Sequence, residues 1–295
     1  MKYILNFAAT PRAIQLFFLH GGPGVGCSSW HRRLFDPKKW QIILFDQRGS
    51  GRSRPFGCIK QNITHGLVGD IKTLLDLLRV EKAVLFGGSW GSTLALIYAI
   101  NHPETVSAMI LRGIWLGEKS ELDYYTRGGV RMNFPEAWER FTYQVPAKHR
   151  KNPLPYYYKK LTAGSEKERQ HFAYEWARYE ESALHLKELS GKKLDRETRD
   201  GSFVSLAIME AHYCLHRLFI EDHYIIKRAK RIRQILATII QGRYDMVCPP
   251  DAAWRLHKQL PYSQIQIVFA GHSASDPEIQ KALIRVTNAM HARLT

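Results

Sequence analysis

The stretch that decides the fold is "LFGGSWGSTLALIYA", Leu85–Ala99. A short apolar run enters a glycine-rich turn that holds one serine, Ser89, and a helix-like apolar pattern leaves it. A G-x-S-x-G pattern between a strand and a helix is typical of a sharp turn that holds a serine hydroxyl at the C-terminal edge of a sheet. The same glycines would also suit a plain tight turn. Ser89 is therefore a candidate nucleophile that needs partners elsewhere in the chain.

Short apolar runs and helical patterns alternate on both sides of this turn. Apolar runs that are almost continuous and are separated by helices predict a parallel sheet covered on both faces. The fold class is therefore α/β, with a mostly parallel sheet and helices on both faces. The expected strands lie within the segments 14–20, 40–49, 82–88, 106–114, 234–245 and 264–273, and the expected helices of this part are 67–80, 92–104, 250–260 and 277–292.

The pattern changes in the middle of the chain. Residues 118–233 are richer in charged and aromatic residues, with helical spacings and no convincing buried strand. We expect a helical cap inserted into the α/β core. The predicted domains are 1–117 as the first part of the core, 118–233 as the cap and 234–295 as the second part of the core.

Composition restricts the partners and the compartment. The chain has 295 residues, 43 Lys and Arg against 27 Asp and Glu, and a net charge of +16. Such a charge could attract nucleic acid or acidic lipid, but a solvated basic surface is the favoured explanation, so neither a specific nucleic-acid partner nor a membrane is predicted. No apolar run approaches the roughly 18 residues of a membrane span, and the N-terminus lacks the pattern of a signal peptide. The four cysteines form no Cys-x-x-Cys pair, which favours a reducing, cytoplasmic location: Cys27, Cys58, Cys214 and Cys248.

Two further residues complete a catalytic constellation with Ser89. Asp245 follows one predicted strand and His272 follows the next. The chain order serine, acid, histidine is that of the α/β-hydrolases. In such a triad the histidine takes the serine proton, while the buried acid holds the imidazole in the correct tautomer. Because all three lie at C-terminal ends of predicted strands, where ligands bind in such sheets, they are predicted to meet.

An oxyanion hole is expected beside the serine. The segment "LHGGPGVG", 19–26, follows the first strand and carries little side-chain bulk. A backbone N–H from Gly22 and the N–H of Trp90 are the predicted donors, since each would point at the same developing negative charge.

Seven segments together resemble the proline iminopeptidases, serine peptidases of the α/β-hydrolase superfamily. The similarity runs from about Phe18 to the C-terminus. It implies an α/β-hydrolase fold, the triad Ser89, Asp245 and His272, and oxyanion donors from Gly22 and Trp90. The segments are "HGGPG", "DQRGSGRS", "NIT", "GGSWGSTLALIYAINHPE", "LRGI", "GRYDMVCPP" and "GHSASDPEI".

The resemblance also implies how a substrate is recognised. The family binds the free amino group of an N-terminal proline with acidic cap residues, and "WARYEES" and "IMEAHY" place Glu180 and Glu210 in the matching positions. Buried carboxylates reward a cationic amine through charge-assisted hydrogen bonds. This chain departs from the family at Glu181, where a small residue is usual.

The N-terminus is a second departure. Members usually begin with an additional β-hairpin, but few residues precede the strand at Ile14. We therefore expect a shortened hairpin, or a different pairing of Met1 to Phe7, with an edge strand left exposed.

Other signals point to packing more than to chemistry. His212 and His216 have a metal-binding i, i+4 spacing, but no Glu follows His212 as in a zinc hydrolase helix. The segment "GGPGVG" lacks the pattern of a nucleotide-binding loop. The basic aromatic cluster Tyr156–Lys160 is expected to pack the cap. No metal and no cofactor are predicted.

Three functions remain after this reading. The favoured one is a metal-free serine aminopeptidase that releases N-terminal proline from small peptides through an acyl-enzyme. The second is an esterase or amidase with broader acyl specificity. The third is a truncated, catalytically weak homologue that acts as a basic binding module. The oligomeric state and the role of the positive charge stay open.

Overall fold

The computed structural model describes residues 5–6, 13–187 and 202–295. Its centre is one seven-stranded sheet with the order β1-β3-β2-β4-β5-β6-β7, in which β2 to β7 are parallel. The parallel sheet predicted from the alternating pattern is confirmed. The strands are β1 (Leu5–Asn6), β2 (Ile14–Leu19), β3 (Trp40–Phe45), β4 (Ala83–Ser89), β5 (Val106–Ile114), β6 (Leu236–Gly242) and β7 (Ser263–Val268).

The edge of the sheet at β3 is partly paired. Leu5 and Asn6 form β1, which runs antiparallel to β3 with Leu5 opposite Phe45. Of the outcomes expected for the N-terminal residues, the structure thus shows a short antiparallel pairing, which covers the C-terminal end of β3.

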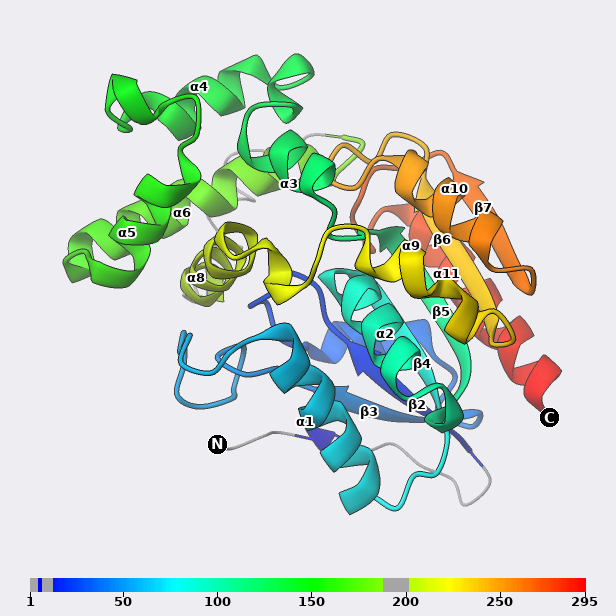
Figure 1. Ribbon diagram of the computed structural model, residues 1–295. Coiled ribbons are helices and arrows are strands. Elements are labelled where there is room, and N and C mark those ends of the chain that lie inside the picture. Colours follow the sequence, from blue (N-terminus) through cyan, green and yellow to red (C-terminus); the bar gives the residue numbers. More distant parts are fainter. Residues whose placement is uncertain (1–4, 7–12, 188–201) are drawn as a thin grey trace.

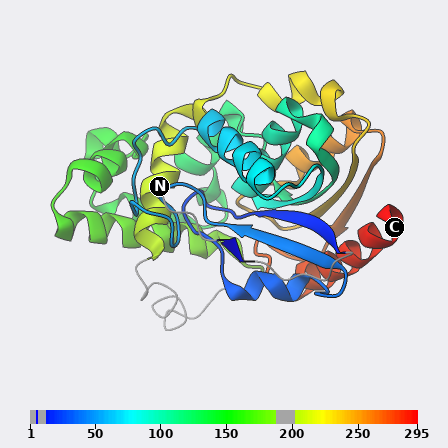
Figure 2. The same ribbon diagram turned by 90° about the horizontal axis from the view of Figure 1, so that it is seen from below.

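Helices cover both faces of the sheet (Figures 1 and 2). Side chains alternate along each strand, so Phe17 on β2 joins the core on one face and Leu16 joins the core on the other. The first face is packed by α1 (Thr64–Leu77), α2 (Trp90–Asn101) and α10 (Pro250–Gln259). The second is packed by η1 (Ser29–Leu34) and α11 (Pro277–Leu294).

The first long helix begins and ends earlier than the pattern indicates. We predicted 67–80, but α1 is Thr64–Leu77. Arg79 has φ +54°, and the N–H of Val80 donates to the carbonyl of Leu75 at 2.9 Å. This left-handed residue ends the helix even though the apolar periodicity continues to Val80.

Between β5 and β6, the described residues form helices. Figure 1 shows α4, α5 and α6 extending to one side, away from the strands. The exact domain boundaries of 118–233 stay a prediction, since α9 and η6, at the end of this range, pack against α2 of the core. The elements are α3 (Lys119–Thr126), η3 (Val130–Met132), α4 (Pro135–Tyr143), η4 (Ala147–His149), α5 (Leu154–Ala163), α6 (Glu166–Leu184), α8 (Ser202–Leu215), η5 (Arg217–Phe219), α9 (Tyr224–Arg228) and η6 (Ala229–Ile232).

Aromatic stacking holds these helices together. The ring of Phe141 on α4 stacks on Tyr157 of α5, with centroids 4.2 Å apart, and on Tyr179 of α6, at 4.4 Å. Tyr157, the middle tyrosine of the basic aromatic cluster, is buried and donates its hydroxyl to the carbonyl of Phe141. This residue therefore packs the helices, as expected.

Across the described part of the chain, no single helix is long and apolar enough to span a bilayer, although the segments Phe203–Leu215 and Arg217–Ile232, bent by 76°, satisfy that criterion as a pair.

The turn between β4 and α2 is compressed at its glycines. A Cβ on Gly87 would lie 2.2 Å from the carbonyl oxygen of Gly91, and a Cβ on Gly91 would lie 2.1 Å from that of Leu19. Ser89, between them, has φ +56° and ψ −128°, which is strained for a residue with a side chain. The glycines are required because strand, helix and β2 approach here to backbone contact.

We expect Gly91→Ala to destabilise the protein by about 3 kcal/mol or more, because the new methyl group meets backbone atoms that have no room to move. Gly69→Ala is the matched control. Gly69 lies in α1 with no atom within 4 Å of an added Cβ, so alanine there should stabilise the helix by roughly 0.5–1 kcal/mol. Urea unfolding of both variants measures the difference. Equal unfolding midpoints would contradict the explanation.

Candidate active site

Ser89, Asp245 and His272 lie at the C-terminal ends of three strands. Ser89 ends β4, Asp245 follows β6 and His272 follows β7. Asp245 Oδ2 and His272 Nδ1 are 2.8 Å apart, and both residues are buried. The carboxylate also accepts hydrogen bonds from the backbone N–H groups of Val247 and Cys248, at 3.1 and 2.7 Å. Asp245 is thus held rigidly against the imidazole.

The partners of His272 determine its tautomer. An ionised carboxylate only accepts, so Nδ1 carries the proton that Asp245 receives. Nε2 lies 3.1 Å from Nη1 of Arg112, which only donates, so Nε2 presents its lone pair. Burial is the main cause that lowers the pKa of His272, with Asp245 opposing and Arg112 reinforcing the shift. The imidazole is therefore neutral at pH 7, as a general base must be.

Arg112 was not predicted as a site residue. It is located on β5 in the segment "LRGI", and its Nη1 also donates to the backbone carbonyl of His272 at 2.7 Å. The only sequence signal was a charged residue within an apolar strand, which by itself does not say what the side chain contacts.

Ser89 and His272 both lie beside the end of β5, and among the described residues no direct hydrogen bond joins them. Ser89 is opposite Ile114 of β5, and a Cβ on Gly113 would lie 2.9 Å from Cε1 of His272. Instead of His272, the Ser89 side chain forms a hydrogen bond with the Cys248 thiol, whose pKa is raised chiefly by burial. Cys248, and not His272, is therefore the hydrogen-bond partner of the Ser89 side chain in this structure.

The predicted oxyanion donors flank the serine. Trp90 is the first residue of α2, so its backbone N–H has no partner within the helix. Gly22 lines the same pocket as Ser89. The indole of Trp90 donates to Gln47 Oε1 at 2.7 Å, and Gln47 Nε2 donates to the carbonyl of His20 at 3.0 Å. Gln47, which was not predicted, thus links the start of α2 to the loop that carries Gly22.

The pocket beside Ser89, here called the Ser89 pocket, also contains both predicted glutamates. Trp176 Nε1 donates to Glu210 Oε2 at 2.5 Å, and the carboxyl groups of Glu180 and Glu210 are hydrogen-bonded to one another. Burial is the largest cause that raises the pKa of both carboxyls. Among the described residues, Glu180 Oε2 is buried with no hydrogen-bond partner. The pocket is lined by Gly22, Ser89, Trp115, Tyr125, Glu180, Glu210, Cys214, Val247 and Cys248.

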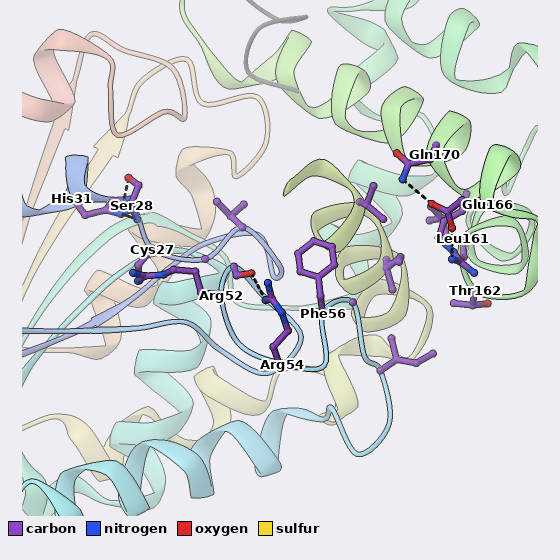
Figure 3. Close-up of a pocket in the computed structure, with 18 residues that line it drawn as sticks. Cys27, Ser28, His31, Arg52, Arg54, Phe56, Leu161, Thr162, Glu166 and Gln170 are labelled. Carbon is purple, nitrogen blue, oxygen red and sulfur yellow. Dashed lines mark hydrogen bonds and ion pairs between the residues drawn. The ribbon is translucent and has the colours of Figure 1, made fainter. Parts of the chain in front are cut away.

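The Ser89 pocket is small. Its volume is about 20 Å³, which is room for about one water molecule. A much larger cavity, about 1070 Å³, lies elsewhere, between the loops 25–28 and 51–59 and the helices α5, α6 and α8 (Figure 3). Figure 3 shows Arg54 and Phe56 on one wall and Glu166 and Gln170 on the other. Its lining contains no residue predicted for catalysis.

His212 on α8 and His216, which directly follows this helix, are engaged in structural hydrogen bonds. His212 Nε2 lies 3.0 Å from the carbonyl oxygen of Asn62, and His216 Nδ1 lies 2.8 Å from that of His212. In the part of the chain that the structure describes, no group of three or more metal-ligating side chains is found.

Comparisons with known proteins agree with this architecture. Residues 15–278 match a family model described as the alpha/beta hydrolase fold. An esterase from Exiguobacterium antarcticum superposes with a TM-score of 0.65 at 17% identity, covering 99% of this chain and 96% of that one. At this identity the likeness shows the fold alone.

Sequence relatives are more specific. The chain is 39% identical to a proline iminopeptidase of Arabidopsis thaliana over 285 residues, which cover 96% of this chain and 75% of that protein. It is 40% identical to a proline iminopeptidase of Xanthomonas citri, over 94% of this chain and 89% of that protein. With such identity over nearly its whole length, the chain belongs to the proline iminopeptidase family, enzymes of the α/β-hydrolase fold.

Proposed function

We propose that the protein releases N-terminal proline residues from small peptides, with Ser89 as nucleophile. The observation that carries the proposal is the buried pair Glu180 and Glu210 in the pocket that holds Ser89, in which Glu180 Oε2 accepts no hydrogen bond from any N–H or hydroxyl group of the described residues. A buried acceptor without a partner is unfavourable, and a cationic amine would satisfy it. The names of the relatives, proline iminopeptidases, indicate that the amino acid bearing this amine is an N-terminal proline.

The chemistry follows from the positions of three side chains. The Ser89 hydroxyl turns from Cys248 to His272 Nε2, where it replaces Arg112 Nη1 as the hydrogen-bond donor. It then gives up its proton as Oγ attacks the carbonyl carbon of proline. The proton then passes from Nε2 to the departing amine of the peptide. Asp245 stabilises the imidazolium that exists between these steps. Water, activated by the same nitrogen, hydrolyses the prolyl ester and restores Ser89.

Backbone groups stabilise the negative charge of each tetrahedral intermediate. Trp90 N–H and Gly22 N–H are the donors, and the Gln47 hydrogen bonds hold their two segments in place. Such donors act without reorganising during the reaction, and one of them typically contributes about 3–4 kcal/mol.

Glu180 and Glu210 recognise the amine. Protonated proline has two N–H groups on its ring nitrogen, and the paired carboxyls offer it one open oxygen and one shared proton that binding can displace. An acylated nitrogen carries no charge and would leave the carboxyls unpaired. Since the Ser89 pocket has room for only about one water molecule, the helices over it must shift to admit the ring.

A pair of amide substrates tests this proposal. Proline 4-nitroanilide should be hydrolysed with a kcat/KM at least about 10²-fold above that of its N-acetylated form, because the blocked nitrogen loses a buried charge pair. Steady-state absorbance measurements on the purified chain give both values. Equal turnover of the two amides would contradict amine recognition, and a preference for neutral esters would favour a broader esterase instead.

A further inference from the structure

We propose that Glu181, His185 and Asp276 form a chain of charged hydrogen bonds, here called the strap. The strap links α6, the helix that carries Glu180, to the backbone of His272 and holds that backbone in position. The proposal rests on the roles of His272 and Glu180 given above. It makes these three residues positioning residues, which act on the reaction through His272.

The centre of the strap is His185, which directly follows α6. Its Nε2 lies 3.1 Å from Glu181 Oε1 and its Nδ1 lies 3.0 Å from Asp276 Oδ1. The three side chains are only 13%, 15% and 9% exposed. Ionised carboxylates accept and do not donate, so both imidazole nitrogens must donate, which requires the protonated ring. Each contact is thus a charge-assisted hydrogen bond between largely buried groups.

Asp276 carries the strap to the catalytic loop. Its Oδ2 accepts the backbone N–H of Gly271 at 2.7 Å and that of Leu186 at 3.3 Å. Gly271 immediately precedes His272. A Cβ at Gly271 would lie 2.7 Å from the nitrogen of Leu186, so the two segments are in backbone contact.

The end of α6 binds the same loop directly. The backbone N–H groups of His272 and Ser273 both donate to the carbonyl of Leu184, each at 2.8 Å. Leu184 lies one helical turn after Glu180, so the element that presents a carboxylate to the amine also fixes the backbone of the base. A shift of α6 during substrate binding would therefore move the backbone of His272.

The strap also explains the departure at Glu181. Adjacent helix positions point about 100° apart, and here Glu180 enters the Ser89 pocket while Glu181 faces His185. The extra carboxylate therefore adds to the strap and does not compete for the amine.

The charge state of the strap depends on pH. Burial lowers the pKa of His185, but the hydrogen bonds and charges of Glu181 and Asp276 outweigh it and raise the value above 6.5. The charged groups near the strap are Glu181 on α6, Asp276 before α11 and, through Asp276, Arg112 on β5 and His272. A raised histidine pKa means that the stabilisation is complete below pH 6.5 and disappears as the pH rises through the raised value. Above it, one nitrogen lone pair faces a carboxylate.

His185→Gln tests the strap. We expect kcat for proline 4-nitroanilide to fall roughly 10- to 100-fold with little change in KM, because the base and not the substrate is misplaced. Wild-type kcat should decline as the pH rises through the raised pKa of His185, and the variant should lack this decline. Glu166→Gln, which breaks an exposed pair with Arg169 at the other end of α6, is the matched control and should leave the profile unchanged.

A second readout separates the strap from the proposed substrate. The rate at which a fluorophosphonate labels Ser89 depends on the serine and His272 whatever the natural substrate is. Slower labelling of His185→Gln, without the decline through the raised pKa of His185, supports the strap even if no proline amide is hydrolysed. If the thermal midpoint of His185→Gln shows that it does not fold, Glu181→Gln, which keeps the contact between His185 and Asp276, is measured in the same way. Wild-type rates with an unchanged pH profile in a folded variant would overturn the proposal.

Discussion

Ser89→Ala is expected to lower kcat for proline 4-nitroanilide by about 10⁶-fold, the size of loss seen when a serine nucleophile of a triad is removed. The hydroxyl is the only group removed, and its partner in the structure is the Cys248 thiol. Because the oxyanion donors and the glutamates remain, KM should change little and a small residual rate should persist.

Ser107→Ala is the control for this substitution. The Ser107 hydroxyl, on β5, is buried and has no hydrogen-bond partner among the described residues, so its removal should alter neither kcat nor the thermal midpoint. Fluorophosphonate labelling should disappear in Ser89→Ala and persist in Ser107→Ala. If Ser89→Ala retained wild-type activity, another nucleophile would have to be sought.

The fold and the position of the site follow from local patterns. Each predicted site residue of the core sits at the end of a strand-like run, and parallel strands place those ends at one edge of the sheet. The elbow around Ser89 is equally local, because its glycines and its strand and helix are consecutive. This is why Asp245 and His272, 27 residues apart in the chain, were expected together and lie at 2.8 Å.

Contacts between distant side chains could not be read in the same way. Arg112 contacts His272, which is 160 positions away in the sequence. Cys248 forms a hydrogen bond with the Ser89 side chain. Each contact depends on the rotamer that close packing leaves open, and no periodicity encodes a rotamer.

The helices between β5 and β6 were predictable as helices but not in their orientation. Composition indicated a helical region, yet which side of α6 faces the Ser89 pocket depends on aromatic packing among Phe141, Tyr157 and Tyr179. That packing decides that Glu180 is in the Ser89 pocket and that Glu181 is not. The strap at His185 depends on this orientation of α6 about its own axis, so no sequence motif predicted it.

Glu180→Gln is expected to lower kcat/KM for the free-amine substrate by about 10²- to 10³-fold, or about 3–4 kcal/mol, because the substrate's cation loses a buried charged partner. The N-acetylated substrate should be affected far less, so the ratio between the two substrates should fall. Glu210→Gln should act in the same direction. Glu175→Gln is the control, since Glu175 lies on the same helix beside Arg140 and outside the Ser89 pocket.

Stability should move opposite to activity in the same variant. Burial and the neighbouring Glu210 raise the pKa of Glu180. Above the ordinary pKa of a glutamate, the folded state therefore keeps a proton that the unfolded state has released. The free energy of unfolding falls as the pH rises from the ordinary pKa of Glu180 through its raised pKa. Glutamine keeps the hydrogen bonds without the ionisation, and Glu180→Gln should therefore unfold at the same temperature as the wild type or higher at pH 8. A lower kcat/KM accompanied by a lower thermal midpoint would mean that the pair serves packing. A lower kcat/KM with a maintained or higher midpoint is the signature of carboxylates kept for the amine at the expense of stability.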